Sequence, residues 1–297
     1  MSILEFSFLA AVLTATAPVV PAALGGLICQ AAGVFNIALE GQLLWGAFTA
    51  VVCGHLTGSA WAGVLGAVLA TVLYAGLLSL ASVTFRADPI VVAVGTNLLA
   101  LGLTAFLMRR IWGSGGTYSS PDLAGLPTLA ELGLDVPVLG PQSPLVPLAA
   151  ALVVAAAWWL ARTRSGLRVR GVGGHREAAE ALGLRAGAYR HGVTLAAGAL
   201  CGLGGAQLAL GNVTLFSEGM SAGRGWIAVV AVMLGGARPY RVLLACLLFG
   251  VAEAVGFRLQ GAGLPQQAAD AAPYVITLLA LVLVAAAARR RPKETTT

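Results

Sequence analysis

The sequence consists largely of long apolar runs, and these runs restrict the chain to one class of fold. Each run holds about 20 residues, mostly alanine, leucine and valine, which is the length an α-helix needs to cross a lipid bilayer. Only 10% of the 297 residues are charged, whereas a soluble domain has about 25%. The sequence therefore predicts an all-α polytopic membrane protein, with residues 1–297 forming a single transmembrane domain.

The apolar runs predict about nine transmembrane helices, within a range of about 8–10. The predicted spans are residues 7–30, 31–53, 60–84, 90–108, 145–161, 191–211, 224–236, 242–256 and 273–288. Pro18 and Pro21 interrupt the first span. The segment 31–53 mixes polar residues with glycines, so we expect one broken helix there, as in many transporter sites.

Basic residues are distributed unevenly between the two sides of these spans. If residues 162–190 form a cytoplasmic loop, 14 of the 18 basic residues lie inside, which agrees with the positive-inside rule. The exceptions outside are Arg109, Arg110, Arg224 and Arg258. This orientation places the N-terminus outside, the C-terminus in the cytoplasm and residues 109–144 in an external loop. The net charge of +6 then follows from topology and does not indicate nucleic-acid binding.

Several catalytic functions lack the residues that they need. Lys293 is the only lysine and follows every predicted span, so the phosphate-binding loop of ATPases is excluded upstream of it. The four cysteines and three histidines show no metal-binding spacing, and we expect neither a metal nor another cofactor in this chain. No serine–histidine–aspartate or paired-carboxylate arrangement recurs in the spans. The chain is not predicted to be an enzyme.

A polar, basic stretch at residues 173–190 contains a predicted short helix at 175–183. Glu177 and Glu180 lie where a helix dipole favours anions, and Gly183 suits a helix end. Ala178, Ala179 and Leu182 are expected on one side, with Arg176 and Glu180 paired on another. Such a helix either lies on lipid or docks on a soluble partner. Its shortness and its alanines favour docking.

Four segments resemble the permease subunits of bacterial ATP-binding-cassette importers, in the nucleoside-uptake branch of the ribose and simple-sugar permease superfamily. They are NIALEGQLLWGAF (36–48), ADPIVVAVGTNLLALGLTAFLMR (87–109), GGHREAAEALGL (173–184) and GRGWIAVVAVMLGGARP (223–239). The similarity extends in order from about residue 20 to 290. It implies a multi-pass protein of the bacterial plasma (inner) membrane that imports a nucleoside or, alternatively, ribose or another simple sugar.

The resemblance also implies partners. A cytoplasmic ATPase subunit would bind ATP and magnesium, a binding protein would deliver the solute from outside, and a second permease subunit would complete the pore, more often a different chain than a second copy. The short helix would be the coupling helix that docks on the ATPase. Its docking residues would be His175, Glu177, Ala178, Ala179, Glu180 and Gly183.

Four polar residues within or beside apolar runs are candidates for the solute path: Asn36, Glu40, Asn97 and Glu253. Glu40 either faces a cavity or partner group within the membrane, or lies at the interface and caps the following helix. Asn97 could bind a solute hydroxyl or base edge, or hold two helices together. Interfacial solvation is the alternative for Glu253. An ion-coupled carrier would need more buried acidic residues than these, so it remains a secondary alternative.

Overall fold

The computed structural model describes residues 3–113, 115–134 and 136–261. The predicted ninth span at 273–288 lies outside the described residues. The elements are α1 (Ile3–Thr16), α2 (Val19–Ala31), α3 (Leu39–Thr57), α4 (Ala60–Ser79), the π-helical turn η1 (Leu80–Thr84), α5 (Pro89–Trp112), β1 (Thr117–Tyr118), α6 (Leu145–Arg162), α7 (Arg164–Gly174), α8 (Arg176–Ala181), α9 (Ala186–Ala206), the π-helical turn η2 (Gln207–Val213), β2 (Phe216–Ser217), α10 (Arg224–Gly235) and α11 (Pro239–Gly261).

Five helical segments among the described residues are long and apolar enough to cross a membrane. They are Ala60–Thr84, Pro89–Trp112, Leu145–Arg162, Ala186–Val213 and Pro239–Arg258. The bent pair α1 and α2 makes a sixth when it is counted as one span. The predicted helical membrane class is confirmed, but the predicted number of nine spans is not.

The segment predicted as a seventh span, 224–236, differs most from expectation. It forms α10, with 12 residues, and a helix of that length rises about 18 Å. The hydrocarbon core of a bilayer is about 30 Å thick. Composition alone made this short helix look like a complete crossing, because its residues are as apolar as those of the longer spans.

Helix α2 lies at the centre of the bundle. The chain bends by 42° between α1 and α2, at the predicted proline interruption, because proline removes a helical hydrogen bond. Twelve of the 13 residues of α2 are buried. It packs against α9, α10 and α11, so α2 is a core helix and does not face lipid.

Small residues on α9 allow α3 and α4 to pack closely against it. A Cβ added at Gly202 would lie 2.7 Å from the carbonyl oxygen of Ala67 on α4, and one added at Gly198 would lie 2.5 Å from the Cβ of Ala75. The Gly198-x-x-x-Gly202 pattern thus marks a close helix contact.

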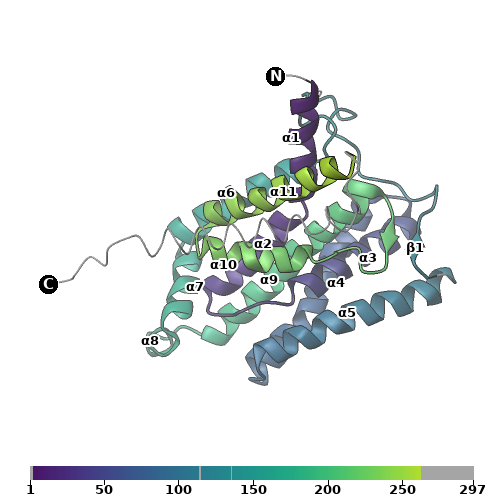
Figure 1. Cartoon of the computed structure of the whole chain (residues 1–297). Helices are drawn as coiled ribbons and strands as arrows, with labels where there is room; N and C mark the ends of the chain where they lie inside the picture. Colours follow the sequence, from purple (N-terminus) through teal and green to yellow (C-terminus); the bar gives the residue numbers. More distant parts are fainter. Residues whose placement is uncertain (1–2, 114, 135, 262–297) are drawn as a thin grey trace.

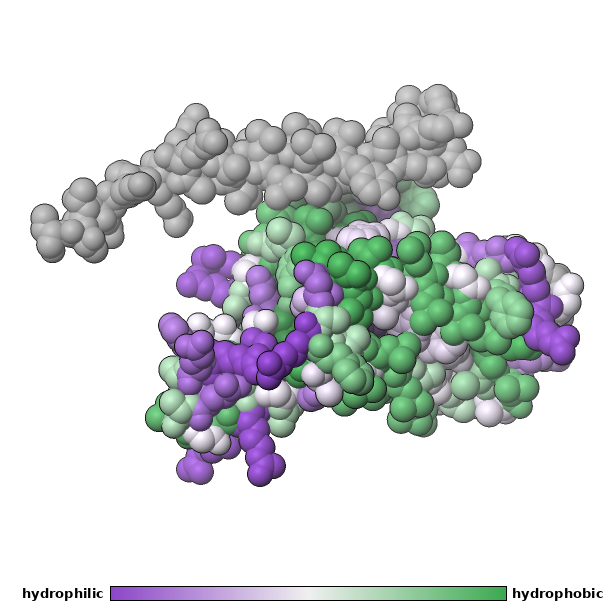
Figure 2. Space-filling model, turned by 90° about the horizontal axis from the view of Figure 1, so that it is seen from below, coloured by the Kyte–Doolittle hydropathy of each residue, from purple (hydrophilic) through white to green (hydrophobic). Residues whose placement is uncertain are grey.

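The helices and strands are arranged along the molecule between two opposite ends (Figure 1). Helices α7 and α8 lie at one end, and β1 lies at the opposite end, where it pairs with β2 through Thr117–Ser217 and Tyr118–Phe216. Hydrophilic residues gather at both ends of the face in Figure 2, with a largely hydrophobic region between them. Helix α5 runs along the outside of the bundle, and only 22% of its most apolar window is buried.

Candidate functional site

The helix predicted to be broken is interrupted between α2 and α3. Residues 32–38 form no helix, and Gly33 adopts a φ of 72°. Asn97 on α5 closes this break: its Nδ2 donates to the carbonyl oxygen of Ile37 at 2.9 Å, and its Oδ1 accepts from the backbone N–H of Gly41 at 2.8 Å. From Pro89 to Asn97, α5 rises about 12 Å. The break therefore lies well along a membrane-spanning helix, and Asn97 satisfies backbone groups that lipid could not.

Glu40 lies in the first turn of α3 and binds the start of α10. Its Oε1 accepts from Ser221 Oγ at 2.6 Å and from the backbone N–H of Gly223 at 2.9 Å. Its Oε2 accepts from the backbone N–H of Gly225 at 2.7 Å. We refer to Glu40, Ser221, Gly223 and Gly225 as the Glu40 clasp. Because helix N-termini carry unpaired N–H groups and partial positive charge, a carboxylate there is stabilised.

Glycine is required at position 225 of the clasp. A Cβ added to Gly225 would overlap the backbone of Glu40, so any larger residue would push α10 away from α3. The sequence left two interpretations of Glu40: a carboxylate that faces a cavity or partner group, or one that caps the following helix. The structure favours the first, because Glu40 binds the start of α10, although it also lies in the first turn of α3.

Glu253 on α11 also binds the N-terminal end of α10, through Arg224. Its Oε1 lies 2.5 Å from Nη2 of Arg224, the first residue of α10. The two side chains are 17% and 20% exposed, so the pair is largely shielded from solvent. Two carboxylates from different helices thus position the N-terminus of α10.

A cavity of about 280 Å³ lies beside the clasp, between α3, α5 and the segment that leads into α10. Its polar lining comes from Glu40, Asn97 and Ser221, and Trp226 contributes an aromatic ring. The apolar lining includes Leu44, Val94, Leu98 and Leu101. Two of the four residues predicted for a solute path, Glu40 and Asn97, therefore meet at one cavity.

The other two predicted residues do not line this cavity. Asn36 is buried, its Oδ1 accepts from the backbone N–H of Ala38 at 2.9 Å, and its Nδ2 lies 3.9 Å from Cys29 Sγ. It shapes the break before α3 and lines a smaller pocket with Gln30 and Phe35. Glu253 acts on the site through Arg224.

Sequence reasoning missed the donors of the clasp. Ser221, Gly223 and Gly225 lie within SAGRG, just before an apolar helical run. A serine at the N-cap, immediately before a helix, is a known N-terminal signal, but Gly223 occupies the N-cap of α10 and Ser221 lies two positions before it, so this signal did not mark Ser221. Trp226 carried no signal beyond being an aromatic residue in an apolar stretch.

The predicted docking helix is present as α8, at the end of the molecule in Figure 1. Its six residues begin after His175, which makes no side-chain cap bond. Arg176 Nε lies 2.8 Å from Glu180 Oε1, as expected for an i,i+4 pair. Gly183, with a φ of 79°, ends the helix, since glycine adopts this left-handed conformation without strain.

The expected shared face of Ala178, Ala179 and Leu182 is wrong in one residue. Ala179 is buried in a small cluster with Val172 and Ala186. Ala178 is exposed, and Leu182 is 83% exposed. Successive helical residues point about 100° apart, so one of two adjacent alanines faces the protein and the other faces away. Every residue from His175 to Gly183 except Ala179 is exposed, so all of them except Ala179 contribute to the outward surface of this segment.

Comparison with known proteins identifies the family. Residues 8–287 match the model of the branched-chain amino acid transport system permease component. The chain belongs to this permease family. It is therefore a multi-pass protein of the plasma (inner) membrane.

Three curated relatives extend this result. The chain is 34% identical to the guanosine ABC transporter permease protein NupQ of Bacillus subtilis (strain 168), over 91% of this chain and 89% of the relative. It is 32% identical to the nucleoside ABC transporter permease protein NupC of Lactococcus lactis subsp. cremoris (strain MG1363), over 90% and 88%. It is 31% identical to the glucose ABC transporter permease protein TsgB13 of Haloferax volcanii, over 81% and 67%.

Proposed function

We propose that this permease forms the membrane path of an ATP-driven nucleoside importer, and that the solute passes the cavity beside the Glu40 clasp. The observation that carries the proposal is the cavity itself, at the point where the N-termini of α3 and α10 meet Asn97 of α5. The identity of more than 30% with permeases named for guanosine and nucleosides supports the choice of solute.

The chemistry of the cavity suits an uncharged solute with one flat face and several hydroxyls. Both Glu40 oxygens accept hydrogen bonds from the α10 segment, so the carboxylate offsets the positive end of α10 and offers little net charge to a passing molecule. Trp226 and the leucines can contact a nucleobase, while Ser221 and Asn97 lie in reach of ribose hydroxyls.

The exposed side of α5 provides the surface for a second permease subunit. Val94, Leu98 and Leu101 line the cavity and are also exposed. A partner packed against this face would bury them and close the cavity from the lipid. We propose a different chain as this partner in preference to a second copy.

The same proposal assigns the other contacts of the transport complex. Helix α8 would be the coupling helix, with His175, Glu177, Ala178, Glu180 and Gly183 on the outward surface that meets the ATPase subunit. That subunit would bind ATP and magnesium and perform the hydrolysis. The α8 end would be cytoplasmic, and the β1 end, with residues 109–144, would face the external binding protein. We keep the N-terminus outside as part of this proposal.

Glucose or another simple sugar is the second candidate solute. The 31% identity to a glucose permease favours it, and a sugar could use the same hydroxyl-binding groups without the contact to Trp226. The two solutes therefore differ in how much uptake depends on this tryptophan.

Competitive uptake decides between these solutes. Cells that express this chain with its neighbouring transport genes would receive labelled guanosine, with unlabelled ribose or glucose in excess. We expect ATP-dependent guanosine uptake that sugars do not reduce, and a strong loss of uptake in Trp226→Ala but not in Trp158→Ala, which alters an exposed tryptophan of α6. Uptake of sugar alone would refute the nucleoside assignment. Uptake without ATP would refute the importer class.

A further inference from the structure

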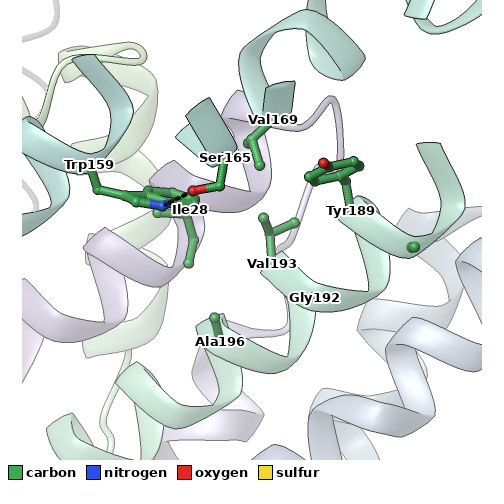
Figure 3. Close-up of a pocket in the computed structure, with 9 residues that line it drawn as sticks. Ile28, Trp159, Ser165, Val169, Tyr189, Gly192, Val193 and Ala196 are labelled. Atoms are coloured by element: carbon green, nitrogen blue, oxygen red, sulfur yellow. Dashed lines mark hydrogen bonds between the residues drawn. The ribbon is translucent and has the colours of Figure 1, made fainter. Parts of the chain in front are cut away.

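A second pocket, of about 260 Å³, lies between α2, α6, α7 and α9 near the α8 end (Figure 3). Apolar side chains form most of its lining: Ile28, Val169, Ala188, Val193 and Ala196. It shares no residue with the cavity beside the Glu40 clasp. Nothing in the proposed solute path uses this pocket.

The few polar atoms around the pocket are bonded to one another or to its rim. Trp159 Nε1 donates to Ser165 Oγ at 2.9 Å, as Figure 3 shows. Tyr189 lies on the other side of the pocket in Figure 3, and its hydroxyl accepts a hydrogen bond from Arg168 Nη1 at 3.3 Å. The interior consequently offers hydrocarbon contacts, and the hydrogen bond to Tyr189 places the exposed guanidinium of Arg168 beside the pocket.

The surroundings of the pocket are strongly basic. Residues 162–190 carry seven arginines against two glutamates, and one of these, Glu180, pairs with Arg176. Arg164, Arg168 and Arg170 are all exposed on α7. No ion pair of Arg168 is found within the described part of the chain. An anion at this edge would therefore meet uncompensated positive charge.

The position of the pocket corresponds to a membrane–water interface. It lies where the apolar helix α6 ends and the basic helix α7 begins. Trp158, one residue before the lining Trp159, is 63% exposed, and Leu167 on α7 is 50% exposed. Exposed tryptophan beside arginine is typical of the level of lipid headgroups, and a basic amphipathic helix commonly lies in that plane.

We propose that this pocket binds an anionic phospholipid of the membrane, with one acyl chain against Ile28, Val193 and Ala196 and the phosphate on Arg168. The apolar lining fits a hydrocarbon chain, and the exposed arginines of α7 fit a negative headgroup. Because Val172 of α7 packs with Ala179 of α8, a lipid bound against α7 would also stabilise the position of α8. The proposal requires the membrane location of the chain but no particular transported solute.

Native mass spectrometry of the purified full-length chain in detergent tests the binding. The probes are dioleoyl phosphatidylglycerol and dioleoyl phosphatidylcholine, which share acyl chains and differ in net charge. We expect tighter binding of phosphatidylglycerol, and a loss of about fivefold in Arg168→Ala, the factor that one arginine near an anionic lipid surface contributes. Equal binding of the two lipids, or full binding by Arg168→Ala, would overturn the proposal. Arg170→Ala is the matched control, because Arg170 is exposed on the same helix, whereas it is Arg168 that bonds to Tyr189 in the pocket lining.

A pocket-filling variant tests the acyl-chain site separately. A Cβ added at Gly192 meets no atom within 4 Å, so Gly192→Leu should fold and fill the pocket that Gly192 lines. Gly187→Leu is the control, since its added Cβ also meets nothing and Gly187 does not line the pocket. We expect Gly192→Leu alone to lose phosphatidylglycerol. Retention of the lipid by Gly192→Leu would contradict an acyl chain at this position.

Phosphatidylglycerol with brominated acyl chains locates the lipid directly, because bromine quenches nearby tryptophan fluorescence. The quenching should fall when Trp159 is replaced by phenylalanine and should persist when Trp226, in the other cavity, is replaced. Displacement of the lipid by millimolar glycerol phosphate would instead indicate a site for free anions. None of these measurements depends on uptake, so a failed transport assay leaves their result intact.

Discussion

Glu40 and Gly225 are 185 positions apart in sequence, and their contact joins the starts of two helices: the backbone N–H of Gly225 donates to Glu40 Oε2 at 2.7 Å. Helix α3 continues from this point toward the β1 end, while α10 runs back toward the α8 end. A partial positive charge accumulates where helix N-termini meet, and Glu40 supplies the compensating negative charge. Any movement of α10 relative to α3 must therefore either keep this bond or expose a carboxylate.

Replacing Glu40 by glutamine removes the negative charge of the side chain and leaves its shape nearly unchanged. The glutamine carbonyl oxygen can accept the two hydrogen bonds that Oε1 accepts in Glu40, but its N–H₂ group then opposes the backbone N–H of Gly225. Hydrogen bonds to charged groups contribute about 1.5–3 kcal/mol each. We expect Glu40→Gln to lower the unfolding free energy by about 2 kcal/mol and to reduce solute uptake strongly.

Thermal unfolding in detergent and uptake in cells measure the two effects of Glu40→Gln. Glu131→Gln is the control, since Glu131 is exposed and accepts one backbone bond, from Thr128. Unchanged stability and uptake in Glu40→Gln would show that the clasp is dispensable.

The Arg224–Glu253 pair should be more sensitive to loss of one partner than to loss of both. Breaking a largely buried ion pair leaves one charge without compensation, which costs about 3–5 kcal/mol when burial is complete. These side chains are 20% and 17% exposed, so the lower part of that range applies. We expect Arg224→Met or Glu253→Leu each to destabilise the chain more than the double variant does.

A double-mutant cycle on unfolding free energies provides the measurement for this pair. If the two single changes simply add in the double variant, the pair makes no coupled contribution, and the positioning of α10 by Glu253 is refuted.

Close packing of α9 predicts that even one methyl group is harmful at Gly198. The added Cβ would lie 2.5 Å from that of Ala75 on α4, and overpacking typically costs about 1–3 kcal/mol. Gly102→Ala on α5 is the matched control, because the added Cβ meets no atom there and alanine favours the helix. Thermal unfolding should show Gly198→Ala below the wild type and Gly102→Ala at or above it. The opposite order would refute the close contact of α9 with α4.

Length and hydropathy predicted the five long apolar helices and the bent α1–α2 pair, because each requires only a local run of apolar residues. The same local signal wrongly predicted a full span at α10, which has only 12 residues. The break at 32–38 was also predictable, since Asn36 and Glu40 interrupt such a run together with glycines. The partners of Glu40 were not predictable, because hydrogen bonds between Glu40 and the 221–225 segment depend on how distant helices pack. The inward direction of Ala179 had the same cause: Ala178 and Ala179 are the same residue type, and only the contact with Val172 and Ala186 determines which of the two faces inward.

The proposed coupling helix gives the sharpest test of the whole assignment. Gly183 has a φ of 79°, a conformation that costs other residues about 1 kcal/mol or more, so Gly183→Val should distort the end of α8. Glu177→Lys reverses a charge on the exposed surface without strain. Both variants should insert normally, which membrane fractionation checks, yet lose ATPase binding in a co-purification and lose uptake. Gly171→Ala is the control, since Gly171 is exposed on α7 and an added Cβ meets nothing. Normal uptake by both variants would refute docking through α8, whereas normal ATPase binding without uptake would place their effect later, in the movement that α8 transmits.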